Sequence, residues 1–310
     1  MGKPNSNIQA MSKEKTAPLA ERVHAYFEQL QLRICTALEE IEQEARFTDD
    51  AWERTGGGGG LTRVMEGGRV FEKAGVNSST VFGVLPSAIA AKMNVPPSEF
   101  FATGLSLVIH PRSPMIPTVH ANYRYFQRSD GDAWFGGGSD LTPYYPFDDD
   151  IIHFHRTLKE ACDRIDGEFF PRFKKSCDEY FYIPHRGEAR GVGGIFFDYL
   201  RGEPEKHFDL VRSAGDVFLA AYLPIVERRM KETWGDPERE WQRIRRGRYV
   251  EFNLIYDRGT LFGLETQGRA ESILMSLPPS VEWRYDVSPP GPLEARLVQL
   301  LKHPREWVVD

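Results

Sequence analysis

The chain has 310 residues, of which 41% are hydrophobic and 27% are charged, a composition typical of a folded globular protein. Its net charge of -6 argues against a protein that coats nucleic acid, and we expect no nucleic-acid partner. An anionic ligand would therefore have to be bound by local arginines. No apolar stretch reaches the ~20 residues of a membrane helix, so we also expect no transmembrane segment.

The ends and the cysteines suggest one cytoplasmic domain. Residues 1–18 are polar and lack the apolar stretch of a signal peptide, so we predict a flexible tail followed by one domain over 19–310. Gly2 lies in a short myristoylation pattern, and the sequence leaves its acylation open. The three cysteines, Cys35, Cys162 and Cys177, form no CxxC pair. Their spacing supports no zinc ribbon, iron–sulfur cluster or disulfide framework, and it favours a reducing, cytoplasmic location.

The first elements follow clear periodic patterns. Residues 19–44 carry apolar side chains three or four positions apart, which predicts a helix. The five glycines at 56–60 are not followed by the Lys-Ser/Thr of a P-loop, and we predict a close-approach loop or a lid. Residues 69–79 are predicted to form a strand and turn, and 86–93 a short helix.

The middle of the chain is predicted to pair two strands and then turn helical. Residues 101–110 and the stretch that begins at Thr118 flank a proline-rich loop, which favours an antiparallel pair. Three aspartates at 148–150 favour the start of a helix over 151–165, because carboxylates stabilise the positive end of a helix. A second helix is expected at 169–182.

The last third is predicted to mix helices with a hairpin. We expect a long helix over 208–232, kinked at Pro224. Alternating apolar residues at 248–257 and a turn signal at 257–259 predict a strand that returns over 260–264. A helix is expected from 272 to 277 and a strand from 281 to 285. Because strands group as hairpins, the predicted fold class is α+β, with a large, mainly antiparallel sheet flanked on both faces by helices in a single domain.

The stretch from Thr118 to Thr142 carries the most unusual side chains. If it is a strand, one face is apolar and suits a core, with Val119, Ala121, Tyr123 and Tyr125. The other face carries His120, Asn122 and Arg124 in a row, which resembles the wall of a polar pocket. Three glycines then precede Asp140, which is either a turn residue or a carboxylate brought close to a ligand.

Arginines and histidines offer further candidates. Arg124 and Arg269 have the guanidinium forks that bind carboxylates, whereas Arg243, Arg245 and Arg246 on a helix at 237–246 are expected to lie on the surface. His153 and His155 are two positions apart on a helix, so they cannot bind one ion together, and His155 falls in an inward-facing stripe. A divalent metal remains an alternative for the histidines in the middle of the chain.

Four long motifs resemble one family. They are HPRSPMIPTVHANYR at 110–124, WFGGGSDLTP at 134–143, HFHRT at 153–157 and RGRYVEFNLIYDRGTLFGL at 246–264. Together they resemble the oxygen-dependent coproporphyrinogen III oxidases of haem synthesis, and the resemblance runs from about Glu21 to the end of the chain.

The resemblance implies a reaction and an assembly. Two propionates of coproporphyrinogen III would be oxidatively decarboxylated to vinyl groups, giving protoporphyrinogen IX, with molecular oxygen as the oxidant and no cofactor required. It also implies a homodimer, with an interface near residues 249–284. The rival interpretations are a metal-dependent oxidase, a tetrapyrrole carrier without activity, and the oxygen-independent enzyme, whose cluster would need a cysteine group that this sequence lacks.

The resemblance also implies residue roles. Asp140 would accept the pyrrole N–H groups and assist deprotonation, His120 would donate a proton, and Arg124 and Arg269 would bind propionates. The remaining substrate contacts would come from Ser106, Asn122, Tyr123, Gln267 and Gly268. An alternative within the family places a divalent metal on His110, His120, His155 and His185. The chain has Gln267 where the family pattern has glycine before Gly268, which leaves any backbone contact at that position open.

Overall fold

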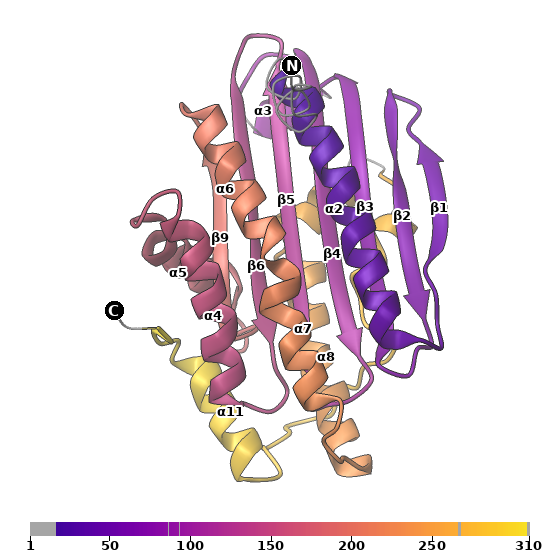
Figure 1. Cartoon of the computed structure of the whole chain (residues 1–310), viewed down its shortest axis with the longest axis vertical. Coiled ribbons are helices and arrows are strands. Elements are labelled where there is room, and N and C mark those ends of the chain that lie inside the picture. Colours follow the sequence, from indigo (N-terminus) through magenta and orange to yellow (C-terminus); the bar gives the residue numbers. More distant parts are fainter. Residues whose placement is uncertain (1–16, 86, 93, 266–267, 309–310) are drawn as a thin grey trace, which may run out of the picture.

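A computed structural model describes residues 17–308 apart from 86, 93 and 266–267. In this part of the chain, seven strands form one antiparallel sheet in the order β1-β2-β3-β4-β5-β6-β9, with helices on both faces (Figure 1). The sheet confirms the predicted α+β class and single domain. Most of the predicted tail, including Gly2, lies outside the described residues.

The strands are long in the centre of the sheet and short at its β1 edge. The bounds are β1 Thr48–Glu53, β2 Gly58–Glu66, β3 Phe71–Val84, β4 Glu99–Pro111, β5 Thr118–Arg128, β6 Ala133–Thr142 and β9 Gly193–Leu200. A separate two-stranded ribbon pairs β7 Tyr182–Ile183 with β8 Glu188–Ala189. The predicted pairing across the proline-rich loop is confirmed, because β4 and β5 pair with Ser106 opposite Asn122.

The helices form two layers around the sheet. In Figure 1, α2 Leu19–Glu42, α6 Pro204–Asp216 and α7 Phe218–Arg229 lie in front of the sheet, and α8 Asp236–Ile255 lies behind it. The other helices are α3 Ser87–Lys92, α4 Asp148–Asp163, α5 Phe169–Tyr180, α9 Arg258–Glu265, α10 Ala270–Leu274 and α11 Pro292–Lys302. Within the described ranges, no helix is long and apolar enough to cross a bilayer.

The main core lies between the sheet and the front helices. The apolar stripe of α2 buries Val23, Phe27 and Ile34 against strands β3 and β4. Each such buried side chain contributes about 1.5–3 kcal/mol relative to exposure to water. This core fixes which face of the sheet is packed, and therefore which face of β5 remains for polar side chains.

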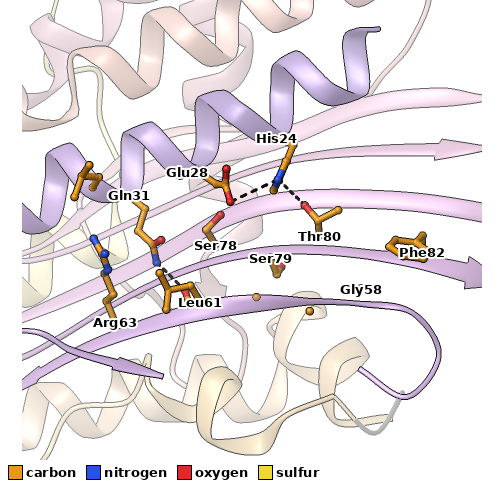
Figure 2. Close-up of a pocket in the computed structure, with 13 residues that line it drawn as sticks. His24, Glu28, Gln31, Gly58, Leu61, Arg63, Ser78, Ser79, Thr80 and Phe82 are labelled. Atoms are coloured by element: carbon orange, nitrogen blue, oxygen red, sulfur yellow. Dashed lines mark hydrogen bonds and ion pairs between the residues drawn. The ribbon is translucent and has the colours of Figure 1, made fainter. Parts of the chain in front are cut away.

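A groove of about 560 Å³ lies between α2 and strands β2 and β3. Figure 2 shows His24 between Glu28 and Thr80, with its Nδ1 2.8 Å from the Thr80 hydroxyl and its Nε2 3.5 Å from the Glu28 carboxylate. Phe82 is half exposed at one end of the groove. The groove belongs to the α2 face of the sheet.

The prediction of one kinked helix over 208–232 was wrong. Two helices, α6 and α7, meet at Val217, and Pro224 lies inside α7. Proline has no N–H to donate to the carbonyl four residues earlier. That carbonyl, on Ala220, instead accepts a 2.9 Å hydrogen bond from His153 Nε2 on α4. A side chain from a neighbouring helix thus satisfies the backbone group that the proline leaves open.

The prediction of a hairpin at 248–264 and a strand at 281–285 was also wrong. Residues 236–255 form α8, residues 258–265 form α9, and 281–285 are irregular. The helix has its own start signal, since the side chain of Glu238 accepts a 2.8 Å hydrogen bond from the Gly235 N–H. A short apolar stretch does not distinguish a strand from a buried segment of helix, and in the observed helix Val250 and Phe252 are buried while Leu254 is exposed.

Two smaller predictions fail for local reasons. Gly58–Gly60 belong to strand β2 rather than to a lid, and a Cβ on Gly60 would lie 2.5 Å from the Trp52 ring. The glycine therefore makes room for a tryptophan, which is the close approach that the sequence predicted. Arg245 and Arg246 are buried rather than on the surface, where they pair with Glu188 and Glu72.

Candidate active site

Strand β5 presents the polar row that the sequence predicted. Val119, Ala121 and Tyr123 are buried against the core, while His120, Asn122 and Arg124 lie on the opposite face, which we call the site face. Paired residues of an antiparallel sheet share a face. The pairing therefore adds Ser106 of β4 and Asn77 of β3 to the row of Asn122.

A hollow of about 180 Å³ lies over this row. Its walls come from β3, β4 and β5: Asn77, Ser79, Val81, Ala102, Thr103, Gly104, Leu105, Ser106, Asn122 and Arg124. The groove under α2 is larger but lies on the other face and contains none of the predicted catalytic side chains. We therefore place the candidate site at the smaller hollow, and we call the site-face surface from His120 to Arg124 the trough.

One end of the trough is a chain of three charged or ionisable groups. His120 Nδ1 lies 2.8 Å from Asp140 Oδ1, and Arg190 Nη2 lies 2.9 Å from both oxygens of the same carboxylate. The sheet register fixes the first contact, because His120 and Asp140 are paired across β5 and β6. Asp140 is only 1% exposed, whereas the His120 side chain is 19% exposed. The Asp140 carboxylate is therefore buried behind the His120 imidazole, and the imidazole is the group exposed to the trough.

Arg190 is held in a box of aromatic rings. Its guanidinium carbon lies 4.1 Å from the Phe181 ring centre, 4.5 Å from Tyr249 and 4.9 Å from Phe252. Its Nη1 donates a 2.7 Å hydrogen bond to Asn253. Sequence reasoning missed Arg190, Tyr249, Phe252 and Asn253, because the last three come from α8, which was taken for a strand.

The charges in this cluster fix the hydrogen-bond roles. Burial alone would raise the pKa of the Asp140 carboxyl, but the adjacent Arg190 guanidinium and the His120 hydrogen bond bring it below its ordinary value. An ionised carboxylate only accepts hydrogen bonds, so His120 Nδ1 must donate its proton to Asp140. That leaves Nε2 of His120 as the ring nitrogen for a ligand, which is the arrangement of an oriented general acid or base.

The opposite end of the trough holds Arg124. Its Nη2 lies 2.8 Å from Asp198 on β9, and its Nη1 donates a 3.3 Å hydrogen bond to Asn122. This ion pair crosses directly over Gly136, where a Cβ would lie 2.6 Å from Asp198 Oδ1 and 2.7 Å from Arg124 Nε. A side chain at Gly136, the first residue of the glycine run, would therefore collide with the two charged side chains that pack on it.

A comparison with protein families gives this geometry its context. The family model described as coproporphyrinogen III oxidase matches residues 22–307 of the 310. The chain belongs to the coproporphyrinogen III oxidase family. This confirms the resemblance inferred from the motifs, and it places the chain among oxidoreductases of haem biosynthesis.

Arg269, which follows α9, lies at the β1 edge of the sheet. Arg269 pairs with Asp50 of the edge strand β1. Asp50 is opposite Thr62, which begins the row that runs through Asn77 and Ser106 to Asn122. Four strand spacings separate Asp50 from Asn122, or ~19 Å. Arg269 therefore lies at the β1 edge of the sheet, several strands away from Arg124 on β5, rather than beside it.

Three other candidates differ in their outcomes. Gly268 lies between α9 and α10, where its N–H donates a 2.8 Å hydrogen bond to the Gly263 carbonyl. Gln267 lies outside the described residues. Tyr123 is fully buried on the core face of β5, so the structure does not bring its side chain to the trough.

The four histidines named as metal candidates do not come together. His110 is buried 2.9 Å from the Ser276 carbonyl, and His155 is buried 3.1 Å from the Val192 carbonyl. His185 contacts Glu251 and Tyr256, away from the His120–Asp140 pair. Among the described residues there is no group of three His, Cys, Asp or Glu side chains placed to bind one metal ion. The donor set of the metal alternative therefore does not fit this geometry.

Proposed function

We propose that the chain catalyses the oxygen-dependent oxidative decarboxylation of two propionate groups of coproporphyrinogen III to vinyl groups, giving protoporphyrinogen IX. The observation that carries this proposal is the buried Asp140–Arg190 pair with His120 above it, at one end of a polar trough that ends at Arg124. Family membership supplies the substrate, and the trough supplies an acid/base group and a carboxylate-binding group for it.

The proposed substrate explains why Arg124 and Arg269 lie far apart. Coproporphyrinogen III carries four propionates at the edge of a macrocycle, and guanidinium forks bind carboxylates in a fixed geometry. Arg124 on β5 and Arg269 beside β1 are several strands apart and would bind propionates on opposite sides of the ring. The hollow of about 180 Å³ is below the roughly 300–1,000 Å³ of a typical ligand pocket. The macrocycle would therefore lie across the trough, with one ring edge in the hollow near Ser106 and Asn122.

His120 would carry out the proton transfers. It is the partly exposed member of the cluster, and Asp140 holds its ring with Nε2 toward the substrate. Direct contact between Asp140 and the pyrrole N–H groups would require the imidazole or Arg190 to move aside, because the carboxylate is buried beneath them. Asp140 accordingly acts in this proposal through His120, whose ring it orients.

Oxygen would serve as the electron acceptor. Each propionate that becomes a vinyl group loses carbon dioxide and two electrons, which the oxidant must take up. An electron-rich pyrrole reacts with oxygen once it is deprotonated and held in position, so the proposed reaction uses no resident cofactor. Measuring turnover after exhaustive chelation, with elemental analysis of the protein, tests this part. Stoichiometric metal whose removal abolishes turnover would overturn it.

We further propose that the chain acts as a homodimer through the region near residues 249–284. Several large apolar side chains of this part of the sequence are exposed: Leu254, Ile255, Leu261, Leu264, Trp283 and, just beyond, Tyr285. Exposed apolar side chains concentrated in one region mark an interaction surface. Ile255→Asp should convert the dimer to a monomer in sedimentation experiments, and Leu32→Asp on α2 is the control. A monomeric wild-type protein would contradict the proposal.

Product analysis tests the catalytic proposal. The full chain, incubated in air with coproporphyrinogen III, should release two carbon dioxide molecules per substrate and form protoporphyrinogen IX, identified by chromatography after oxidation. His120→Gln should bind the substrate but form the product far more slowly. Tight binding with no turnover by the wild-type protein would instead support a tetrapyrrole carrier.

A further inference from the structure

The hollow has one further polar wall residue, Asn77 of β3. It lines the hollow together with Ser106 and Asn122. The three are neighbours in one row, because Asn77 pairs with Ser106 across β3 and β4, and Ser106 pairs with Asn122 across β4 and β5. The site face therefore presents a second amide at this row, for which the proposed function has so far no role.

The Thr62 hydroxyl on β2 fixes the Asn77 side chain. Thr62 is 2% exposed, it is paired with Asn77 across the two strands, and its hydroxyl donates a 2.8 Å hydrogen bond to Asn77 Oδ1. The same hydroxyl oxygen accepts a 3.0 Å hydrogen bond from Trp52 Nε1 and lies 2.7 Å from Ser272 Oγ. A hydroxyl has one proton and two acceptor lone pairs. Because the proton of Thr62 goes to Asn77, the Ser272 hydroxyl must donate to Thr62, and the bonding capacity of Thr62 is then full.

This network decides which end of the Asn77 amide faces a ligand. Oδ1 is turned toward Thr62, so Nδ2 with its two N–H donors is left for the hollow that Asn77 lines. Thr62 is itself held from two sides, by Trp52 of β1 and by Ser272 of α10. The amide is thus oriented before a ligand arrives, which lowers the entropy lost on binding.

The chemistry of the proposed substrate identifies what these donors can bind. All four ring nitrogens of coproporphyrinogen III are N–H donors, so the hydrogen-bond acceptors of the molecule are its propionate oxygens. The Asn77 donors therefore suit a propionate and not the ring centre. Asn77 lies two strand spacings from Asn122 and two from Asp50, the partner of Arg269, or ~10 Å from each. It is placed midway between the His120 strand and Arg269.

We propose that Asn77 is a further substrate-binding residue of the trough, whose Nδ2 donates to one propionate of the substrate, and that Thr62 is the positioning residue that orients it. This inference rests on the proposed function for the identity of the ligand. An aspartate at position 77 would still accept the Thr62 hydrogen bond, but it would present a carboxylate oxygen to the propionate in place of two donors. The amide at this position therefore determines whether an anionic substituent is accepted there.

Binding of coproporphyrin III measures the role of Asn77 without turnover. The oxidised ring carries the same four propionates, and its dissociation constant is measured by porphyrin fluorescence on the full chain. Asn77→Asp should raise the dissociation constant at least tenfold, because two like charges then meet. Asn77→Ala removes the donors without adding a charge and should raise the constant at least threefold.

A matched control separates this effect from a change in net charge. Gln29→Glu makes the same amide-to-carboxylate change at an exposed position of α2, on the other face of the sheet. It should leave the dissociation constant within twofold of wild type. A constant for Asn77→Asp within twofold of wild type, or an equal rise in Gln29→Glu, would overturn the inference.

The role of Thr62 is tested through its coupling to Asn77. Thr62→Val removes the hydroxyl and should raise the dissociation constant at least twofold, whereas Thr62→Ser keeps the hydroxyl and should bind as wild type does. The double variant Thr62→Val/Asn77→Ala should bind as Asn77→Ala alone, because Thr62 acts through the amide. Additive effects of the two substitutions would show that Thr62 does not orient Asn77. Thermal melting of each variant confirms that it is folded.

Kinetics then distinguish the inference from the proposed function. With coproporphyrinogen III, Asn77→Asp should raise KM at least tenfold and leave kcat within threefold, because the amide is two strands away from His120. If the wild-type protein turns over and Asn77→Asp keeps the wild-type KM, the inference is wrong and the proposed function stands. If the wild-type protein does not turn over while the binding pattern of the variants is as expected, only the proposed reaction fails.

Discussion

His120 and Asp140 occupy different positions relative to the trough, and this difference separates their roles. The imidazole is the group that a ligand meets, and the carboxylate lies behind it. His120→Gln removes the proton donor but keeps a side chain of similar length. Because acid/base catalysis contributes about 10²–10⁴-fold, we expect kcat to fall by that factor with KM and melting temperature little changed. His303→Gln, at an exposed histidine, is the control. A His120→Gln enzyme within fivefold of wild-type kcat would remove His120 from the proposed chemistry.

The Asp140–Arg190 pair is buried, so each partner depends on the other. Arg190→Met leaves Asp140 as an unpaired buried charge, and we expect the free energy of unfolding to fall by about 3–5 kcal/mol. Asp140→Asn in the same chain removes that charge, so the double variant should recover at least half of the loss. Urea unfolding of the two single variants and the double variant gives the coupling energy. Additive effects of the two substitutions would show that the contact does not stabilise the fold as a pair.

The sequence predicted the exposed half of the site better than its buried half. Alternation along one strand was sufficient to place His120, Asn122 and Arg124 on one face. Ser106 was named only through the family resemblance, and the structure places it opposite Asn122. Arg190 carries no comparable local signal, because it lies in a loop between β8 and β9 and meets Asp140 only through tertiary packing. Asp198 was missed for a similar reason, because its contact with Arg124 joins two strands far apart in the chain.

At the scale of elements, Gly136 of β6 lies directly beneath the Arg124–Asp198 ion pair. Gly136→Ala would place a Cβ against both Arg124 and Asp198, at distances that require one of them to move. We expect KM for coproporphyrinogen III to rise at least fivefold, because Arg124 would no longer be held over the sheet. Gly167→Ala, where a Cβ meets nothing within 4 Å, is the matched control. An unchanged KM in Gly136→Ala would contradict the role given to the Arg124–Asp198 pair.

The elements that were predicted correctly had long patterns or strong end signals. Helix α2 carries six apolar residues in register, and α4 begins at the three aspartates as expected. Residues 248–255 were harder, because a short apolar stretch cannot by itself distinguish a strand from a buried segment of helix. In the folded chain α8 supplies Tyr249, Phe252 and Asn253 around Arg190, and this tertiary packing decided the helix.

At the scale of the whole molecule, two buried histidines make stability depend on pH. Burial, together with Lys174, lowers the pKa of His155 to about 3, and burial with Arg246 lowers that of His110 well below its ordinary value. An unfolded histidine titrates near ~6.5, so below that pH the unfolded chain takes up protons that the folded chain cannot. Stability is therefore lost as pH falls, by about 2 kcal/mol for His155 at pH ~5.

The variant His155→Gln isolates one of these contributions. The glutamine retains an N–H donor for the Val192 carbonyl but has no titrating ring. Between pH 7.5 and pH 5, the free energy of unfolding in urea should fall by about 2 kcal/mol less in the variant than in wild type. Equal losses in the two proteins would show that His155 is not held neutral in the fold.

Oxygen consumption tests the central claim most directly. Purified protein and coproporphyrinogen III are mixed in a sealed cell that records dissolved oxygen and released carbon dioxide, first in air-saturated buffer and then under argon. The proposed function predicts that dissolved oxygen falls in air as carbon dioxide is released, that carbon dioxide release stops under argon, and that turnover resumes when oxygen is readmitted. Carbon dioxide release that continues under argon at the aerobic rate would contradict an oxygen-dependent oxidase.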